Sequence, residues 1–80
     1  MNQGFPDKAR LEAYRARYPK GTRVALVRMD DPYTRLRPGD KGTVLYVDDA
    51  GGAQITWDNG SSLAAILGVD IITILEEGTL

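Results

Sequence analysis

Apolar and polar positions alternate with a period of two through the middle of the chain. The residues that carry the pattern are Val44, Tyr46 and Val47 before a polar segment at 48–52, and Ala53, Ile55 and Trp57 after it. A period of two is that of a strand with one face toward a core. The pattern therefore predicts two strands joined by a turn, with one apolar face between them.

Turn-forming residues divide the rest of the chain into three further strands. The Asn-Gly pair at 59–60 accepts the positive φ angles of a type I′ hairpin turn, so a strand is expected at 61–65. Residues 22–28 and 71–75 are rich in Val, Ile and Thr and predict the first and last strands. A single turn of 3₁₀ helix is expected at 66–70. The chain is thus predicted to be mainly β, with five strands.

An Ala- and Arg-rich segment near the start predicts one α-helix. Asp7 is a suitable N-cap, and the helix is expected to run to about Tyr18. Leu11, Tyr14 and Tyr18 follow one another at helical spacing and form a narrow apolar stripe. Three turns are marginal as an isolated helix, so we expect the stripe to dock on the strands. The predicted organisation is a helical extension at 1–20, a β domain at 21–75 and a tail at 76–80.

The connection after the first strand, residues 29–41, is much longer than the roughly five residues typical between strands. Five short strands, a long first loop and a 3₁₀ turn before the last strand describe an SH3-like barrel. Pro and Gly pairs within the loop, at 31–32 and 38–39, predict that it is ordered. Tyr33 and Arg35 are expected at its tip.

Composition and charge narrow the chemistry. The 80 residues provide for one domain, and they include no cysteine and no histidine, which excludes disulfides, tetrahedral zinc sites and imidazole bases. No apolar run reaches the roughly 18 residues of a membrane span or forms a signal peptide, so a cytoplasmic protein without membrane contact is expected. Residues 1–40 carry nine Lys or Arg against five acids, and residues 41–80 carry one against six. Such a two-poled field can orient a partner.

Catalytic and metal-binding patterns are missing from the sequence. The acid pairs at 30–31, 48–49 and 76–77 are adjacent, so in extended chain their carboxylates point to opposite faces and do not converge as an acid and a base. The acidic turn at 48–52 lacks the alternating spacing of a calcium loop, and no phosphate-binding glycine motif precedes a helix. The sequence predicts a protein that is not an enzyme and that holds neither a cofactor nor a metal.

Several motifs in order resemble a known family. They are YPKGTRV at 18–24, MDDPYT at 29–34, PG at 38–39, GTV at 42–44 and WDNGSSL at 57–63. Together they resemble the bacterial and phage family called domain of unknown function 4314, over roughly residues 10–75. The second half also resembles, in fold, the mind-bomb/HERC-type module of ubiquitin ligases. The first resemblance implies an SH3-like small barrel from a mobile genetic element or phage, and it implies no activity. The chain departs from the family pattern in carrying Arg35 and Arg37 where proline is more common.

Two classes of function follow from these features. The first is a protein-binding adaptor or inhibitor, in which aromatic residues with nearby arginines form the contact. The predicted contact residues are Tyr33, Arg35, Arg37, Tyr46 and Trp57. For Trp57 the apolar face that it shares with Ile55 also predicts a core position, and for Tyr33 packing against the barrel remains an alternative.

The second class is a nucleic-acid-binding module of the KOW kind, with phosphate contacts from the basic half of the chain. Its predicted contact residues are Arg10, Arg15, Arg17, Lys20, Arg23 and Arg28, with Arg35 and Arg37. The acidic pI of about 5.2 favours the protein-binding class. A third alternative is a structural subunit that assembles, with itself or with another chain, through an edge strand of the barrel.

Overall fold

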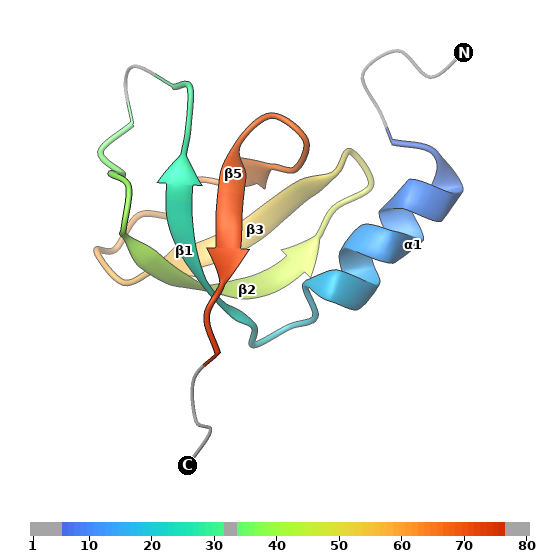
Figure 1. Ribbon diagram of the computed structural model, residues 1–80, viewed down its shortest axis with the longest axis horizontal. Helices are drawn as coiled ribbons and strands as arrows, with labels where there is room; N and C mark the ends of the chain where they lie inside the picture. The colour runs from blue at the N-terminus through green and yellow to red at the C-terminus, as the bar shows by residue number, and fades with distance from the viewer. Residues whose placement is uncertain (1–5, 32–33, 77–80) are drawn as a thin grey trace.

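The fold is one antiparallel sheet with a helix at its side (Figure 1). The computed structural model describes residues 6–31 and 34–76. Within them, helix α1 (Lys8–Arg17) precedes the strands β1 (Arg23–Arg28), β2 (Lys41–Val47), β3 (Gly52–Trp57), β4 (Ala65–Ile66) and β5 (Ile71–Ile74). The strands lie in the order β4-β3-β2-β1-β5. The mainly β class, the five strands and the N-terminal helix are confirmed. The sheet is not closed, so the predicted barrel is not confirmed.

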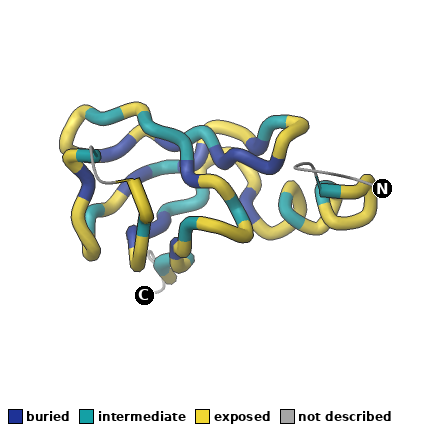
Figure 2. The backbone as a smooth tube through the Cα atoms, turned by 90° about the horizontal axis from the view of Figure 1, so that it is seen from above, coloured by how far each residue is buried: buried dark blue, intermediate teal, exposed yellow. Residues whose placement is uncertain are grey.

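The alternating positions of the sequence build the core. Ile55 and Trp57 of β3 are buried together with Val44 of β2 and Val24 and Leu26 of β1. Figure 2 shows the buried stretches on the strands and a largely exposed α1. The predicted register of β3, with Ile55 and Trp57 facing inward, is confirmed.

Irregularities in two strands interrupt the alternation. The pairing of β2 with β3 shifts register between Val44 and Tyr46, so that Leu45 and Tyr46 are exposed while Val47 returns to the core. The pairing of β1 with β5 shifts in the same way between Leu26 and Arg28. An extra residue in one strand of a pair turns the following side chains to the other face.

The predicted strand at 61–65 and the predicted 3₁₀ turn at 66–70 are both corrected by the structure. Residues 61–64 are irregular because side chains take their main-chain groups: the Leu63 carbonyl accepts a hydrogen bond from the Trp57 indole, and the Leu63 N–H donates to Ser61 Oγ. Strand β4 begins only at Ala65, and the residues between β4 and β5 form an ordinary turn.

The hairpin turn at 58–60 also differs from the predicted type I′. Gly60 has a φ of 94°, whereas Asn59 does not adopt a positive φ. The Asn59 side chain instead accepts a hydrogen bond from the Ser61 N–H at 2.9 Å, which stabilises the turn without a left-handed asparagine.

Helix α1 begins and docks as the sequence predicts. The Asp7 side chain caps it by accepting a hydrogen bond from the Arg10 N–H at 2.8 Å. Tyr18 is buried in the core, and Leu11 and Tyr14 are packed against it. The described part of the chain contains no helix that is both long and apolar enough to cross a lipid bilayer.

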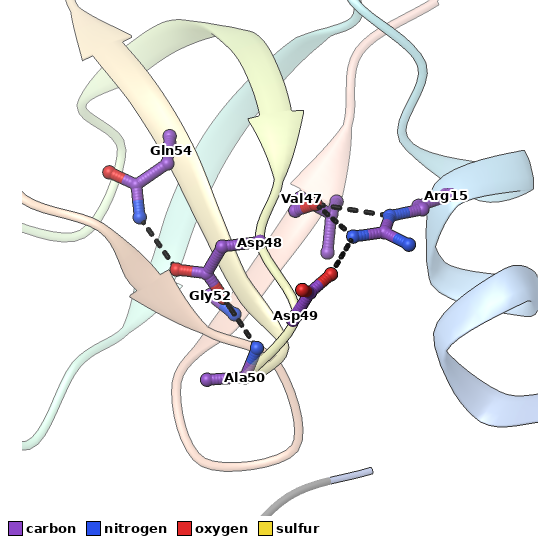
Figure 3. Close-up of polar contacts among 7 residues, drawn as sticks. All are labelled: Arg15, Val47, Asp48, Asp49, Ala50, Gly52 and Gln54. Atoms are coloured by element: carbon purple, nitrogen blue, oxygen red, sulfur yellow. Dashed lines mark hydrogen bonds and ion pairs between the residues drawn. The ribbon is translucent and has the colours of Figure 1, made fainter. Parts of the chain in front are cut away.

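An arginine and the β2–β3 turn join the helix to the sheet (Figure 3). The Arg15 guanidinium donates two hydrogen bonds to the Val47 carbonyl, at 3.1 and 3.0 Å, and one to Asp49 Oδ1 at 2.7 Å. Such a fork satisfies a main-chain carbonyl at the end of β2. Arg15 therefore positions α1 against the hairpin.

Asp48 organises the same turn (Figure 3). Its Oδ1 accepts hydrogen bonds from the Ala50 and Gly52 N–H groups at 3.0 and 2.8 Å, and its Oδ2 accepts one from Gln54 Nε2 at 3.0 Å. The hydrogen bond from Gly52 is the largest of the effects that hold the pKa of the Asp48 carboxyl below its usual value.

The protein is therefore expected to lose stability in acid through Asp48. A carboxyl whose pKa is lowered by folding stabilises the native state above its ordinary pKa of 3.8, and this contribution disappears as the pH falls through the native pKa. Urea unfolding between pH 2 and pH 6 should show a smaller loss of unfolding free energy with acid in Asp48→Asn than in the wild type. Asp49→Asn, a change at an exposed neighbour, should keep the wild-type slope, and equal slopes in all three proteins would contradict the assignment.

Candidate functional site

The long loop and the β3–β4 connection enclose a cleft of about 370 Å³. Arg35 and Thr34 line it from the loop side, and Asn59, Ser61 and Leu63 line it from the other side. The polar side chains on the second side are engaged in holding the turn, since Asn59 accepts from Ser61 and Ser61 accepts from Leu63. Of the predicted contact residues, the cleft contains Arg35.

The other predicted contact residues do not gather around Arg35. Tyr33 lies outside the described residues. Arg37 is exposed on the loop, where its N–H donates to Asp40 Oδ2 at 2.9 Å. Tyr46 is 57% exposed on β2, beside a different hollow of about 220 Å³ next to the end of α1. The structure therefore does not unite these residues into one contact surface.

Trp57 belongs to the core, so its prediction as a contact residue is corrected. Its side chain is 1% exposed, and its indole N–H donates to the Leu63 carbonyl at 2.7 Å. Burial of both the ring and its polar atom leaves no part of Trp57 for a partner. Its effect on the cleft is indirect, because it fixes the main chain of Leu63.

Arg23, one of the predicted phosphate contacts, is engaged within the sheet. Its guanidinium donates to both carboxylate oxygens of Asp58, at 2.8 and 2.7 Å, and to Thr43 Oγ1 at 3.0 Å. The hydrogen bond from Arg23 holds the pKa of the Asp58 carboxyl below its usual value. A bidentate pair of this kind competes with phosphate for the same donors.

The remaining predicted phosphate contacts fall into two groups. Arg15 is held by Val47 and Asp49 as described above, and Arg28 pairs with Asp30 at 3.3 Å. Arg10, Arg17 and Lys20 are exposed on α1 and the turn that follows it. Half of the predicted set is therefore paired with carboxylates, which does not favour the nucleic-acid alternative.

A surface that the sequence did not single out is more apolar than any of these sites. Val27, Ile66, Val69 and Ile71 are between 45% and 58% exposed. Ile71 lies opposite Arg28 in the β1–β5 pairing, at the shift that contains Val27, and Ile66 and Val69 line one hollow. We call these four residues the apolar end; in Figure 1 β1 ends and β5 begins at this end of the sheet.

The hollow beside the apolar end combines an apolar wall with acidic residues. Its volume is about 330 Å³, and Met29, Leu63 and Ala64 line it together with Ile66 and Val69. Asp30, Asp31 and Asp70 line it as well. The Asp70 carboxylate accepts a hydrogen bond from the Ile66 N–H at 2.8 Å, which fixes the turn that carries Val69.

A metal ion is not what these acids hold. In residues 6–31 and 34–76, no group of three or more acidic side chains is arranged to bind one. The hollow therefore offers apolar contact area with negative charge beside it.

The apolar end has a sequence signal of its own. Ile66, Leu67 and Val69 surround a glycine in a connection between two short strands, where Gly, Asn, Asp and Ser usually dominate. Large apolar residues in such a turn indicate either burial or contact with a partner. The predicted 3₁₀ turn gave them a local role and concealed this signal.

Fold and surfaces define a small, mainly β domain. The model of the family described as Domain of unknown function (DUF4314) matches residues 7–75, and the chain belongs to this family. The predicted family is thereby confirmed, and the match covers α1 and all five described strands. No curated protein and no solved structure matches the chain. The likeness to SH3-like barrels and to the mind-bomb/HERC-type module is not confirmed by these comparisons.

Proposed function

We propose that this protein is a non-enzymatic protein-binding module and that the apolar end is its contact surface. The observation that carries the proposal is that four of the six large hydrophobic side chains exposed within the described residues lie at this one end. Exposed apolar area in one patch, with polar residues at its border, is typical of a protein contact. Scattered single residues would not support the same conclusion.

The acidic residues define the chemistry of the partner. An apolar side chain of the partner enters the hollow next to Ile66 and Val69, and Lys or Arg on either side of it faces Asp30 and Asp70. A protein of this size with such a surface acts as an adaptor or inhibitor. The resemblance to bacterial and phage proteins supports a role in a mobile genetic element.

Selection from a random peptide library tests this proposal, because the protein then chooses its ligand from all side-chain combinations. Peptides selected on the wild-type protein should share a large apolar residue flanked by Lys or Arg. Their affinity should fall about tenfold or more for Val69→Asp, because loss of an interface anchor corresponds to at least about 1.4 kcal/mol. Fluorescence anisotropy of labelled peptides measures the affinities.

The control is Thr56→Asp, which places the same charge at an exposed strand position that does not line the hollow. It should bind the peptides as the wild type does. Val69 is exposed, so Val69→Asp should unfold within a few degrees of the wild type. Equal affinity of the folded Val69→Asp variant for every selected peptide would exclude the apolar end as the contact surface.

Affinity capture from the native host, with and without nuclease, separates this function from the nucleic-acid alternative. A protein partner should remain bound after nuclease treatment, and Val69→Asp should not capture it. A partner that is released by nuclease, together with binding to DNA or RNA that weakens steeply with salt, would favour the alternative.

A further inference from the structure

The outer edge of β5 presents main-chain groups without partners. Leu75 donates its N–H to the Arg23 carbonyl at 2.8 Å, and Thr73 pairs with Ala25 in the same register. In an antiparallel ladder the intervening residues, Ile72 and Ile74, point their N–H and C=O groups away from β1. Among the described residues, no hydrogen bond reaches these outward groups.

A groove runs along the start of this edge. It has a volume of about 310 Å³, and its lining residues are Tyr14, Arg17, Tyr18, Leu67, Gly68, Asp70, Ile71 and Ile72. Tyr14, Arg17 and Tyr18 lie on one face of α1, since they are three and four positions apart. The groove therefore has a helix on one side and the edge of β5 on the other. Ile72 is only 9% exposed, and an unpaired main-chain group in such a place destabilises the protein unless a ligand or water satisfies it.

Arg17 supplies a positive charge in the groove. Its Nε lies 3.4 Å from the Tyr18 hydroxyl, and its guanidinium carbon lies 5.7 Å from the centre of the Tyr18 ring. No carboxylate in the described part of the chain forms an ion pair with Arg17. Asp70, the acid that also lines the groove, has one oxygen engaged by the Ile66 N–H. The stacked guanidinium therefore keeps donors for a carboxylate.

We infer that the groove binds an extended, acidic peptide segment of a partner protein as an additional strand along β5. The main chain of the peptide pairs with the outward groups of Ile72 and Ile74. One of its apolar side chains lies between Tyr14 and Ile72, and a Glu or Asp pairs with Arg17. Addition of a strand between an edge and a helix satisfies the main chain, while the groove selects the side chains. This site is distinct from the apolar end and does not depend on the function proposed for it.

A defined peptide tests the inference. The probe is an octapeptide of alternating valine and threonine with one central glutamate, blocked at both ends, and its matched control has lysine in place of the glutamate. In ¹⁵N-resolved NMR titration, the glutamate peptide should shift the amide signals of Ile72 and Ile74 and slow their exchange with water. The lysine peptide should bind about tenfold more weakly, as expected for a charge-assisted hydrogen bond.

Charge reversal makes the test specific. Arg17→Glu should weaken the glutamate peptide about tenfold and should favour the lysine peptide instead. Lys8→Glu, an equal charge change on an exposed helix residue that does not line the groove, should bind both peptides as the wild type does. Val69→Asp should also leave this binding unchanged, which separates the groove from the apolar end.

Three results would overturn the inference. One is the absence of shifts at Ile72 and Ile74 up to millimolar peptide. Another is unchanged peptide preference in Arg17→Glu. The third is concentration-dependent dimerisation in sedimentation, with the same amides protected in the dimer, which would assign the edge of β5 to a second copy of this chain.

Discussion

Trp57→Ala is expected to unfold the protein at room temperature. The indole fills the core at 1% exposure, and truncation of a buried Trp leaves a cavity that costs about 3–5 kcal/mol. The variant also removes the donor to the Leu63 carbonyl, which then remains unsatisfied next to the cavity. A domain of 80 residues has a total stability of about 5 kcal/mol, so the loss is comparable to the whole.

Far-ultraviolet circular dichroism during urea titration measures this effect without relying on tryptophan fluorescence. Trp57→Phe keeps most of the ring volume but not the N–H group, so it should retain a folded state with intermediate stability. Tyr46→Ala removes an aromatic side chain that is 57% exposed and should change the unfolding free energy by less than about 1 kcal/mol. A Trp57→Ala variant as stable as Tyr46→Ala would place the indole outside the core.

The fold was predictable wherever local pattern and tertiary packing agree. Asp7 is a strong N-cap in any helix, and the stripe of Leu11, Tyr14 and Tyr18 has one sensible partner, the core of the sheet. The period of two through Ile55 and Trp57 likewise leaves one register in which both are buried. In these segments the neighbouring residues carry enough information to determine the structure.

The segments that differ from prediction depend on partners distant in the chain or on irregular pairing. Residues 61–64 read as a strand, but the indole of Trp57 and the hydroxyl of Ser61 take the main-chain groups of Leu63. The shift in β2 leaves Tyr46 exposed beside Val47, an arrangement that a strict period of two does not predict. Closure of the sheet was expected from the strand count, but strand count alone does not determine it.

The candidate site was less predictable than the fold for the same reason. Arg15 and Arg23 stood out as free cations, yet each finds a carboxylate more than thirty residues away, Asp49 and Asp58. Sequence spacing does not reveal such pairs, because they arise only when the sheet brings the turns beside the helix and the first strand. The apolar end has the opposite origin: its members read as buried residues, and it emerges as a surface only because the sheet leaves them uncovered.

Gly42→Ala is expected to destabilise the protein by at least about 3 kcal/mol, at the upper end of the range for overpacking a core. Gly42 lies in β2 directly opposite Trp57 and is itself buried. A Cβ atom at this position would lie 2.6 Å from Ile55 Cγ2 and 3.0 Å from both the Thr56 carbonyl oxygen and Trp57 Cε3. Two of these neighbours are core side chains and one is main chain, so none of them moves without disturbing β3.

A double-mutant cycle with Ile55→Ala separates this steric effect from a general loss of strand stability. Ile55→Ala removes the nearest atom, so the second substitution should cost less in that background than in the wild type. Lys41→Ala, at the exposed neighbouring position of the same strand, should change the unfolding free energy by less than about 0.5 kcal/mol. Additive effects of Gly42→Ala and Ile55→Ala would mean that the added methyl group does not meet Ile55, and the close packing of β2 on β3 at this point would then be wrong.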